Sequence, residues 1–345
     1  MTARRATDPA VLAVDGGNSK VDVAILAADG TLLGAVRGPT ISHQAVGLDE
    51  GVRRFASTVQ GARIAAGLEP GVRIPTAVAC LAGADYPEDM RALSRALGAV
   101  GAADELEILN DTFAALRAGA SRPWGIALIC GQGINGAAVG VDGRRVRFAG
   151  VGDISGDWGG ASSVGMAGLG AAVRARDGRG PRTALERAIP AAVGLRRPED
   201  VTRAYYAGRL DEARVGNLAP FVFRTAAAGD VVARGIVNRL ADELVVMAAA
   251  LGRRAHLVRR DPDVVCGGSV FRTDDSAFHD RIRAGISAAI RDARVVRLGS
   301  PPVLGAALIA LDRLSPDGAT PPPIAERARS GIDGWDATAR VVTAS

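Results

Sequence analysis

The stretch VLAVDGGNSKVDVAILAADG, residues 11–30, decides how the rest of this chain is interpreted. Two apolar, β-prone runs, residues 11–14 and 21–27, flank an acidic residue and two glycines. Asp29-Gly30 marks a tight turn after the second run. The pattern therefore predicts a strand, a glycine turn and a second strand that ends in a hairpin.

The glycine turn has the chemistry of a phosphate-binding loop. Gly16 and Gly17 leave their backbone N–H groups open to an anion, and Asp15 could hold a hydrated Mg²⁺. Side-chain donors follow from Asn18, Ser19 and Lys20, the last being the only lysine in a chain otherwise rich in arginine. The alternative is an ordinary β-hairpin with a solvated lysine.

The same pattern returns in residues 126–148, as a strand, a turn with Gly131 and Gly133, a second strand, Asp142-Gly143 and a third strand. This similarity to residues 11–37 indicates an internal duplication. We expect two α/β lobes with one glycine turn each, facing each other across a cleft that could clamp a polyphosphate and its metal.

Two further polar segments are candidates for substrate chemistry. Asp111 follows a short strand and precedes a helix, where a carboxylate faces the ligand crevice of an open α/β sheet. It could instead be a helix N-cap. Residues 38–47 carry Thr40, Ser42, His43 and Gln44, which could hydrogen-bond a polyol or simply begin the next helix.

The later part of the chain holds a third glycine signal. A strand at residues 263–266 runs into Gly267-Gly268-Ser269, where the backbone could lie flat against a nucleobase. The glycine-dense residues 150–170 suit a binding loop. Residues 183–252 are predicted to be α-rich, with one helix over residues 210–228, and residues 315–345 to form a loosely attached tail or an oligomer contact.

Composition excludes several classes of protein. The net charge is +5, but the arginines are scattered among 37 acidic residues and aromatics are only 4%, which argues against nucleic-acid binding. The three cysteines lie far apart and form neither a disulfide framework nor a zinc site. We also find no secretory signal and no membrane span, so we expect a cytoplasmic protein.

With these segments in order, the sequence resembles the superfamily of sugar kinases, Hsp70 and actin. Within it, the chain is most similar to the N-acetylglucosamine kinase and BadF/BadG/BcrA/BcrD ATPase branch, over roughly residues 11–314. The two phosphate motifs match residues 15–20 and 131–135, and the catalytic-aspartate segment matches residues 110–112. The adenosine motif matches residues 267–271, and the two sugar segments match residues 38–47 and 156–160. Gln132, Ile134 and Trp158 depart from the usual pattern.

The resemblance implies an α/β fold of two ribonuclease H-like lobes, with ATP in the cleft between them. Residues 1–119 would form the first lobe, closed by a helix at 303–314, and residues 120–302 the second. Asp15 would hold Mg²⁺ and Asp111 would be the general base on the sugar's primary hydroxyl. The residues that would bind the sugar are Ser42, His43, Asn110, Asn135 and Asp157. Those that would bind the phosphates are Gly16, Gly17, Asn18, Ser19, Lys20, Gly131, Gln132 and Gly133. The adenosine would lie against Gly267, Gly268 and Ser269.

The function that these expectations favour is ATP-dependent phosphorylation of N-acetylglucosamine or glucosamine at the 6-hydroxyl, by a homodimer. One alternative is an activator ATPase of the BadF/BadG type, which would need cysteines for an iron–sulfur cluster. Others are a non-catalytic sugar sensor and a kinase of another hexose or polyol.

Overall fold

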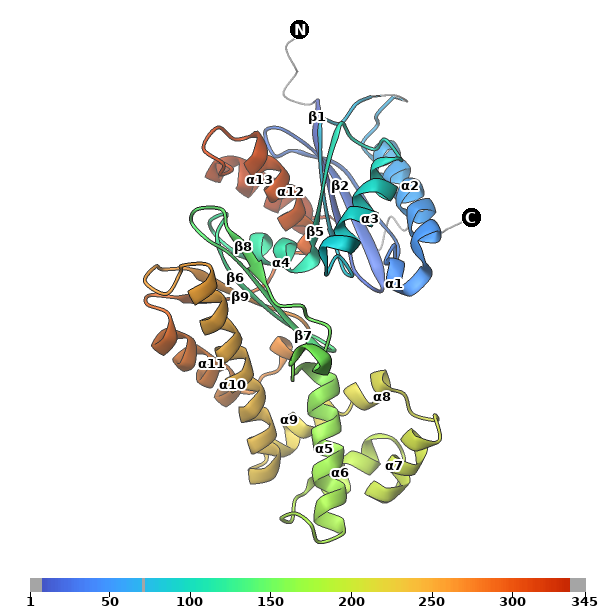
Figure 1. Ribbon diagram of the computed structural model, residues 1–345, viewed down its shortest axis with the longest axis vertical. Coiled ribbons are helices and arrows are strands. Elements are labelled where there is room, and N and C mark those ends of the chain that lie inside the picture. The colour runs from blue at the N-terminus through green and yellow to red at the C-terminus, as the bar shows by residue number, and fades with distance from the viewer. Residues whose placement is uncertain (1–7, 70–71, 336–345) are drawn as a thin grey trace. The chain divides into compact units, whose positions relative to one another are not determined.

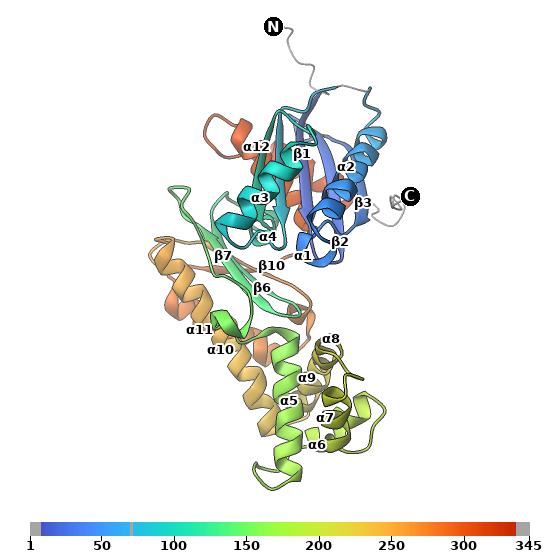
Figure 2. The same ribbon diagram turned by 45° about the vertical axis from the view of Figure 1, so that its right-hand side comes forward.

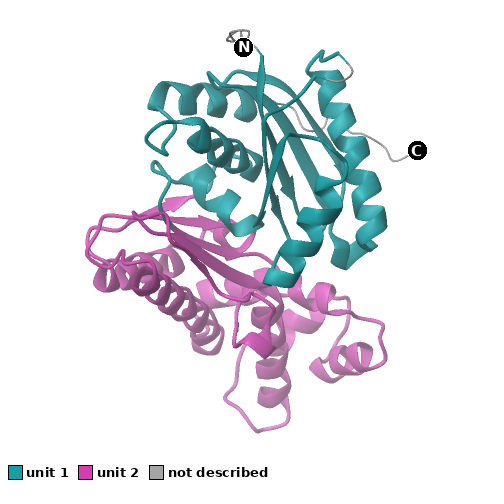
Figure 3. Cartoon of the chain, turned by 45° about the horizontal axis from the view of Figure 1, so that its top comes forward, with its two compact units in different colours: residues 1–125, 298–345 teal, residues 126–297 magenta. Residues whose placement is uncertain are grey.

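The computed structural model describes residues 8–69 and 72–335. The chain divides into two compact units (Figure 3): unit 1 comprises residues 1–125 and 298–345, and unit 2 comprises residues 126–297. The helix expected at residues 303–314 to close the first lobe belongs to unit 1. Each unit holds its own mixed sheet with helices, which confirms the α/β class.

Unit 1 is built on a five-stranded sheet in the order β3-β2-β1-β4-β5. The strands are β1 (Pro9–Gly16), β2 (Lys20–Ala27), β3 (Leu32–Pro39), β4 (Thr76–Leu81) and β5 (Glu105–Asn110). The first three are antiparallel, and β4 and β5 run parallel to β1. Every residue of β1 and β4 is buried, because helices cover both faces of the sheet (Figure 1).

The helices of unit 1 bracket this sheet. They are α1 (His43–Val46), α2 (Leu48–Ala65), α3 (Pro87–Gly98), α4 (Asp111–Gly119), α12 (Pro302–Leu314) and α13 (Pro322–Asp333). Helix α12 packs on β1 and α4, and a Cβ at Gly305 would lie 1.8 Å from the Ala114 carbonyl oxygen. Helices α12 and α4 therefore meet backbone to backbone, which only glycine permits at this position.

The sheet of unit 2 repeats that of unit 1, with the order β10-β9-β6-β7-β8. Its strands are β6 (Gly125–Cys130), β7 (Ile134–Val139), β8 (Arg145–Arg147), β9 (Asp263–Gly267) and β10 (Arg294–Arg297). The first three strands of each sheet are consecutive neighbours, and the last two are added in parallel on the other side of the first. This shared topology confirms the duplication inferred from the sequence.

Helices α10 (Val231–Arg254) and α11 (Ser276–Ala289) pack against each other beside this sheet. A second group surrounds α5 (Gly160–Arg176), as Figure 2 shows: α6 (Leu185–Ala192), α7 (Pro198–Tyr206), α8 (Glu212–Gly216) and α9 (Ala219–Ala227). The prediction of a single helix over residues 210–228 is wrong, because this segment forms two helices, α8 and α9, separated at Asn217. Within the described ranges, every helix is too short or too polar to cross a lipid bilayer.

The tail differs from the loosely attached extension that we expected. Helix α13 buries Ala328 and Ile332, and Arg327 donates to the carboxylate of Asp29 at 2.7 Å. A Cβ on Gly30 would lie 2.3 Å from the Ile324 carbonyl oxygen, so the first hairpin turn rests directly on this helix. The tail is thus part of unit 1 as far as Trp335, and residues 336–345 lie outside the described range.

Candidate functional site

The first glycine turn joins β1 to β2 as predicted. A Cβ at Gly16 would lie 2.7 Å from Leu81 Cδ2, whereas one at Gly17 would meet only the Lys20 carbonyl oxygen, at 3.8 Å. Gly16 therefore packs closely against Leu81, and Gly17 has space around its α-carbon. The N–H of Gly17 is not open to an anion as expected, because it donates to the Lys20 carbonyl at 2.9 Å. The side chains of Asn18 and Ser19 are exposed, so their donors are available to an anion.

Four charged side chains stand beside this turn. Asp15 is only 6% exposed, and burial raises the pKa of its carboxyl, an effect that Asp22 strengthens and Lys20 opposes. Lys20 Nζ lies 3.3 Å from Asp15 Oδ2 and also contacts Asp22. Arg37 donates to both oxygens of Asp22, at 2.7 and 2.9 Å. Lys20 and Asp15, the predicted cation and the candidate metal ligand, are thus in direct contact. Asp22 and Arg37, which we had not predicted, lie beside them.

The loop before α2 presents two unsatisfied polar atoms. Ser42 is 3% exposed and stands at the N-cap position of α1, but its hydroxyl makes no capping bond. Among the described residues, none hydrogen-bonds to Ser42 Oγ or His43 Nδ1, both of which are buried. Buried polar atoms almost always have partners, so these two atoms are candidate contacts for a polar ligand. The hydroxyl of Ser42 does not cap the helix.

Asp111 lies in a hydrogen-bonded constellation at the ends of β4 and β5. The N-cap of α4 is Asn110, whose side-chain oxygen accepts from the Thr112 N–H and hydroxyl, and Asp111 is the first helical residue. The Asn110 amide donates to Asp85 at 3.1 Å, and Gln44 from the α1 helix reaches the same carboxylate at 3.4 Å. Asp85 therefore connects the Ser42–His43 loop to the start of α4.

The second glycine turn rests on the N-terminus of α5. The N–H groups of Ala161 and Ser162 donate to the carbonyls of Gly131 and Gln132, at 2.9 and 3.0 Å. The side chain of Gln132 donates to the Ser162 hydroxyl at 2.8 Å. A Cβ on Gly160 would lie 2.5 Å from the Gln132 carbonyl oxygen, so part of the glycine density at residues 150–170 serves to seat this turn.

The two unit 2 residues expected to bind sugar have partners inside the unit. Asn135 accepts from the Gly136 N–H at 2.7 Å, and a Cβ on Gly150 would lie 2.3 Å from its Nδ2. Asp157 accepts from the hydroxyl of Ser155. Trp158, which stands where the family has an acidic residue, stacks under Arg239 of α10 at 3.8 Å. The tryptophan thereby fixes the segment on α10.

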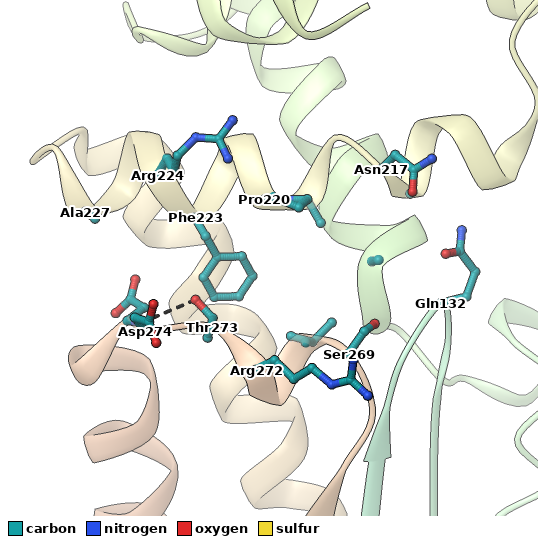
Figure 4. A pocket seen from close by; sticks show the side chains of 15 residues that line it. Gln132, Asn217, Pro220, Phe223, Arg224, Ala227, Ser269, Arg272, Thr273 and Asp274 are labelled. Atoms are coloured by element: carbon teal, nitrogen blue, oxygen red, sulfur yellow. Dashed lines mark hydrogen bonds between the residues drawn. The ribbon is translucent and has the colours of Figure 1, made fainter. Parts of the chain in front are cut away.

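A cavity of about 620 Å³ lies within unit 2, between α9 and the segment after β9 (Figure 4). Phe223 of α9 points toward the segment that carries Ser269 and Arg272, and Gln132 stands at one side. The volume and the mixed apolar and polar lining suit a nucleoside. Ser269 and Gln132, both predicted to bind ATP, therefore share one cavity.

Gly268 has a packing role that the sequence did not reveal. Its φ is +101°, and a Cβ there would lie 2.3 Å from the Cys130 carbonyl oxygen. The double glycine thus lets β9 turn against the end of β6, which places Ser269 at the cavity wall. The wall continues to Asp275, which caps α11 and pairs with Arg234 at 2.9 Å.

The cysteines have the character of core residues. Cys80, Cys130 and Cys266 are all buried, and none of the three forms a disulfide. Burial raises the pKa values of Cys130 and Cys266 to about 12, so both remain thiols at neutral pH. Metal clusters require thiolates.

The described residues contain no group of three or more His, Cys, Asp or Glu side chains arranged to hold a metal. A divalent cation at Asp15 would therefore depend on phosphate oxygens and water for its remaining ligands. Mg²⁺ prefers one or two carboxylates together with such ligands, and buried Asp15 fits that arrangement.

Several residues of the site were missed in the sequence. Asp85 and Gly83 follow β4 without a motif, and Asp22 and Arg37 occupy mid-strand positions that alternation alone cannot distinguish from solvated charges. Phe223 reaches its cavity from helix α9, about 40 residues before β9. Only the strand end at Asp85 carried a usable signal, because parallel strands place their carboxyl ends together.

The family model described as the BadF/BadG/BcrA/BcrD ATPase family matches residues 12–310. The chain belongs to this family.

Two curated relatives match most of the chain. It is 26% identical over 306 residues to the N-acetylmuramic acid/N-acetylglucosamine kinase of Clostridium acetobutylicum, covering 87% of this chain and 97% of that protein. It is 24% identical over 313 residues to the N-acetyl-D-glucosamine kinase of Dictyostelium discoideum, with the same coverages.

A solved structure from Chromobacterium violaceum, provisionally named N-acetylglucosamine kinase, has a TM-score of 0.65 at 22% identity. The match covers 88% of this chain and 99% of that one. The two chains therefore share a fold.

Proposed function

We propose that this protein is an ATP-dependent kinase of an amino sugar, N-acetylglucosamine or glucosamine, acting on the 6-hydroxyl. The observation that carries the proposal is the pair of unsatisfied buried atoms, Ser42 Oγ and His43 Nδ1, in the loop that Gln44 and Asp85 connect to the start of α4. A polyol brings the hydroxyl groups that both atoms need. The names of the curated relatives support the choice of an amino sugar.

In this proposal Asp111 is the general base. It accepts the proton of the sugar's primary hydroxyl as that oxygen attacks the γ-phosphorus and ADP leaves. The first turn of α4 favours a charged carboxylate at this position, because the helix N-terminus carries partial positive charge. The Asn110 side-chain oxygen accepts from the N–H and the hydroxyl of Thr112, and its amide donates to Asp85 and to the Ala84 carbonyl. A sugar hydroxyl would therefore have to replace one of these partners to bind Asn110.

Charge on the transferred phosphoryl group is met by Lys20 and by backbone N–H groups of the two glycine turns. The N–H groups of Gly17 and Gly131 are not among them, because each donates to a carbonyl within its own turn. Mg²⁺, held by Asp15, supplies further neutralisation when bound with ATP. The cavity lined by Phe223, Ser269 and Arg272 takes the adenosine, and Asn135 and Asp157 take sugar hydroxyls. We further propose that the enzyme works as a cytoplasmic homodimer.

An activator ATPase of the BadF/BadG type is the second candidate, because the family description includes such proteins. Its iron–sulfur cluster would need accessible cysteine thiolates. Buried Cys130 and Cys266 with raised pKa values disfavour this role. The sugar kinase is therefore the better-supported function.

A coupled ADP-release assay with Mg-ATP and a panel of sugars tests the proposal. We expect turnover with N-acetylglucosamine or glucosamine to exceed that with glucose and N-acetylmuramic acid, with ³¹P NMR detecting a 6-phosphate. A different preferred sugar would keep the kinase and change the substrate. Absence of stimulation by every sugar would reject the kinase, and iron analysis would then test the activator.

Gly83 offers a mutational test of the sugar loop. Its φ is +82°, and a Cβ there would lie 2.9 Å from His43 Cε1 and 3.0 Å from Gln44 Cδ. Gly83→Ala should displace both side chains and raise KM for the sugar about 10-fold, while KM for ATP stays unchanged. Steady-state kinetics with each substrate varied in turn measures the difference.

Gly101→Ala is the matched control for this variant. Gly101 has a similar φ of +67° but nothing within 4 Å of its Cβ position. Both variants should lose about 1–2 kcal/mol of unfolding free energy from left-handed backbone strain. Equal sugar KM values in the two variants would show that the contact with His43 and Gln44 is unimportant.

A further inference from the structure

Four charged side chains lie together where β1, β2 and β3 meet the first glycine turn. Asp15 on β1 is paired in register with Asp22 on β2, and Asp22 with Arg37 on β3. Lys20 precedes Asp22 by two residues, so the two side chains share a face of the sheet. Two carboxylates and two cations thus form one row with no net charge.

The contacts within the row are unequal. Asp22, whose side chain is fully buried, receives two hydrogen bonds from Arg37 and one from Lys20. Lys20 Nζ also lies within ion-pair distance of Asp15, and the Lys20 side chain is 34% exposed. Arg37 alone is sufficient to neutralise Asp22, so Lys20 can move away without leaving Asp22 as an unpaired buried charge.

Lys20 occupies the position where a metal would be needed. Carboxylates directly opposite each other on neighbouring strands repel, and a cation between them removes the repulsion. In the protein without nucleotide, the ammonium of Lys20 is that cation. A divalent ion approaching Asp15 would have to displace it against like charge.

We propose that Lys20 is the cation that occupies the phosphate site whenever nucleotide is absent, and that Asp22 with Arg37 is the positioning pair that holds it there. A polyphosphate offers the ammonium new oxygen partners, which releases the Asp15 carboxylate for the metal. Free divalent ions are consequently excluded until nucleotide arrives. This inference rests on the proposed function only in assigning ATP and Mg²⁺ to this turn.

Mn²⁺ binding to the nucleotide-free protein, measured by electron paramagnetic resonance, tests the proposal. Wild type should bind Mn²⁺ weakly, and Lys20→Met should bind it at least about 10-fold more tightly, because the Asp15 carboxylate becomes available to the cation. Adding Asp15→Asn to Lys20→Met should reverse most of the gain. Lys20→Gln, which keeps a polar side chain, should behave like Lys20→Met.

The matched control is Arg53→Met, which removes a cation of unit 1 that is paired with Glu50 on exposed helix α2. It should leave Mn²⁺ affinity unchanged. Tight Mn²⁺ binding by the wild-type protein without nucleotide would overturn the proposal, as would equal affinities of wild type and folded Lys20→Gln. Neither measurement involves sugar or turnover, so the result is separable from the ADP-release test of the kinase.

Discussion

Asp111→Asn is expected to lower kcat for sugar phosphorylation by about 10³-fold, since a general base commonly contributes 10²–10⁴-fold. Asparagine has nearly the same shape as aspartate, and the cap of α4 depends on Asn110 and Thr112 rather than on Asp111. The variant should therefore fold normally. ATP affinity should stay within about twofold, because the base acts on the sugar hydroxyl.

The measurement is ADP release at saturating sugar, paired with calorimetric titration of ATP. Asp104→Asn is a suitable control, because Asp104 is a unit 1 aspartate paired with Arg73 on the surface. That control should keep wild-type kcat. More than a tenth of wild-type kcat in Asp111→Asn would show that another group accepts the proton, or that alignment alone accounts for the rate.

Asp312→Ala is expected to produce the largest loss of stability, about 3–5 kcal/mol, because it leaves a buried charge without its partner. Asp312 accepts from Arg117 at 2.7 and 3.0 Å and from the Thr320 N–H at 2.7 Å, and Arg117 is 5% exposed. These bonds join α4, α12 and the loop before α13. Their loss should weaken unit 1 throughout.

Urea unfolding of the variant measures this effect, with the transition of unit 1 moving to lower denaturant. The double variant Arg117→Met/Asp312→Leu should recover most of the loss, since apolar replacements of a buried pair are often tolerated. Arg313→Ala, which breaks only exposed pairs with Glu105 and Glu107, should change stability by less than about 1 kcal/mol. Equal losses in Asp312→Ala and Arg313→Ala would contradict the burial argument.

The sequence was most informative where hydrophobic periodicity and glycine turns coincide. The duplicated strand pattern at residues 11–37 and 126–148 led directly to two sheets of one topology. Most of these strands are short, mainly apolar and bounded by turn residues, so their local signal agrees with their final environment. The candidate base was also placed correctly after β5, although its neighbour Asn110 is the residue that caps α4.

Features that depend on distant partners were invisible in the sequence. Asp22 resembles any polar residue in a strand until the register sets it between Asp15 and Arg37. Helix α13 begins within a run of three prolines and has few apolar residues, so composition indicated a loose tail. Its attachment relies on Gly30 and Asp29, some 300 residues earlier in the chain. Such contacts carry no local pattern.

The return of the last helices to unit 1 has a consequence for how the protein is made. Unit 2 is one continuous segment, whereas the sheet of unit 1 lacks α12 and α13 until the final part of the chain has left the ribosome. Domains generally fold as units during synthesis. Unit 1, although its translation starts before that of unit 2, must therefore finish folding after it. The face of β1 that α12 covers stays exposed while unit 2 completes its own core.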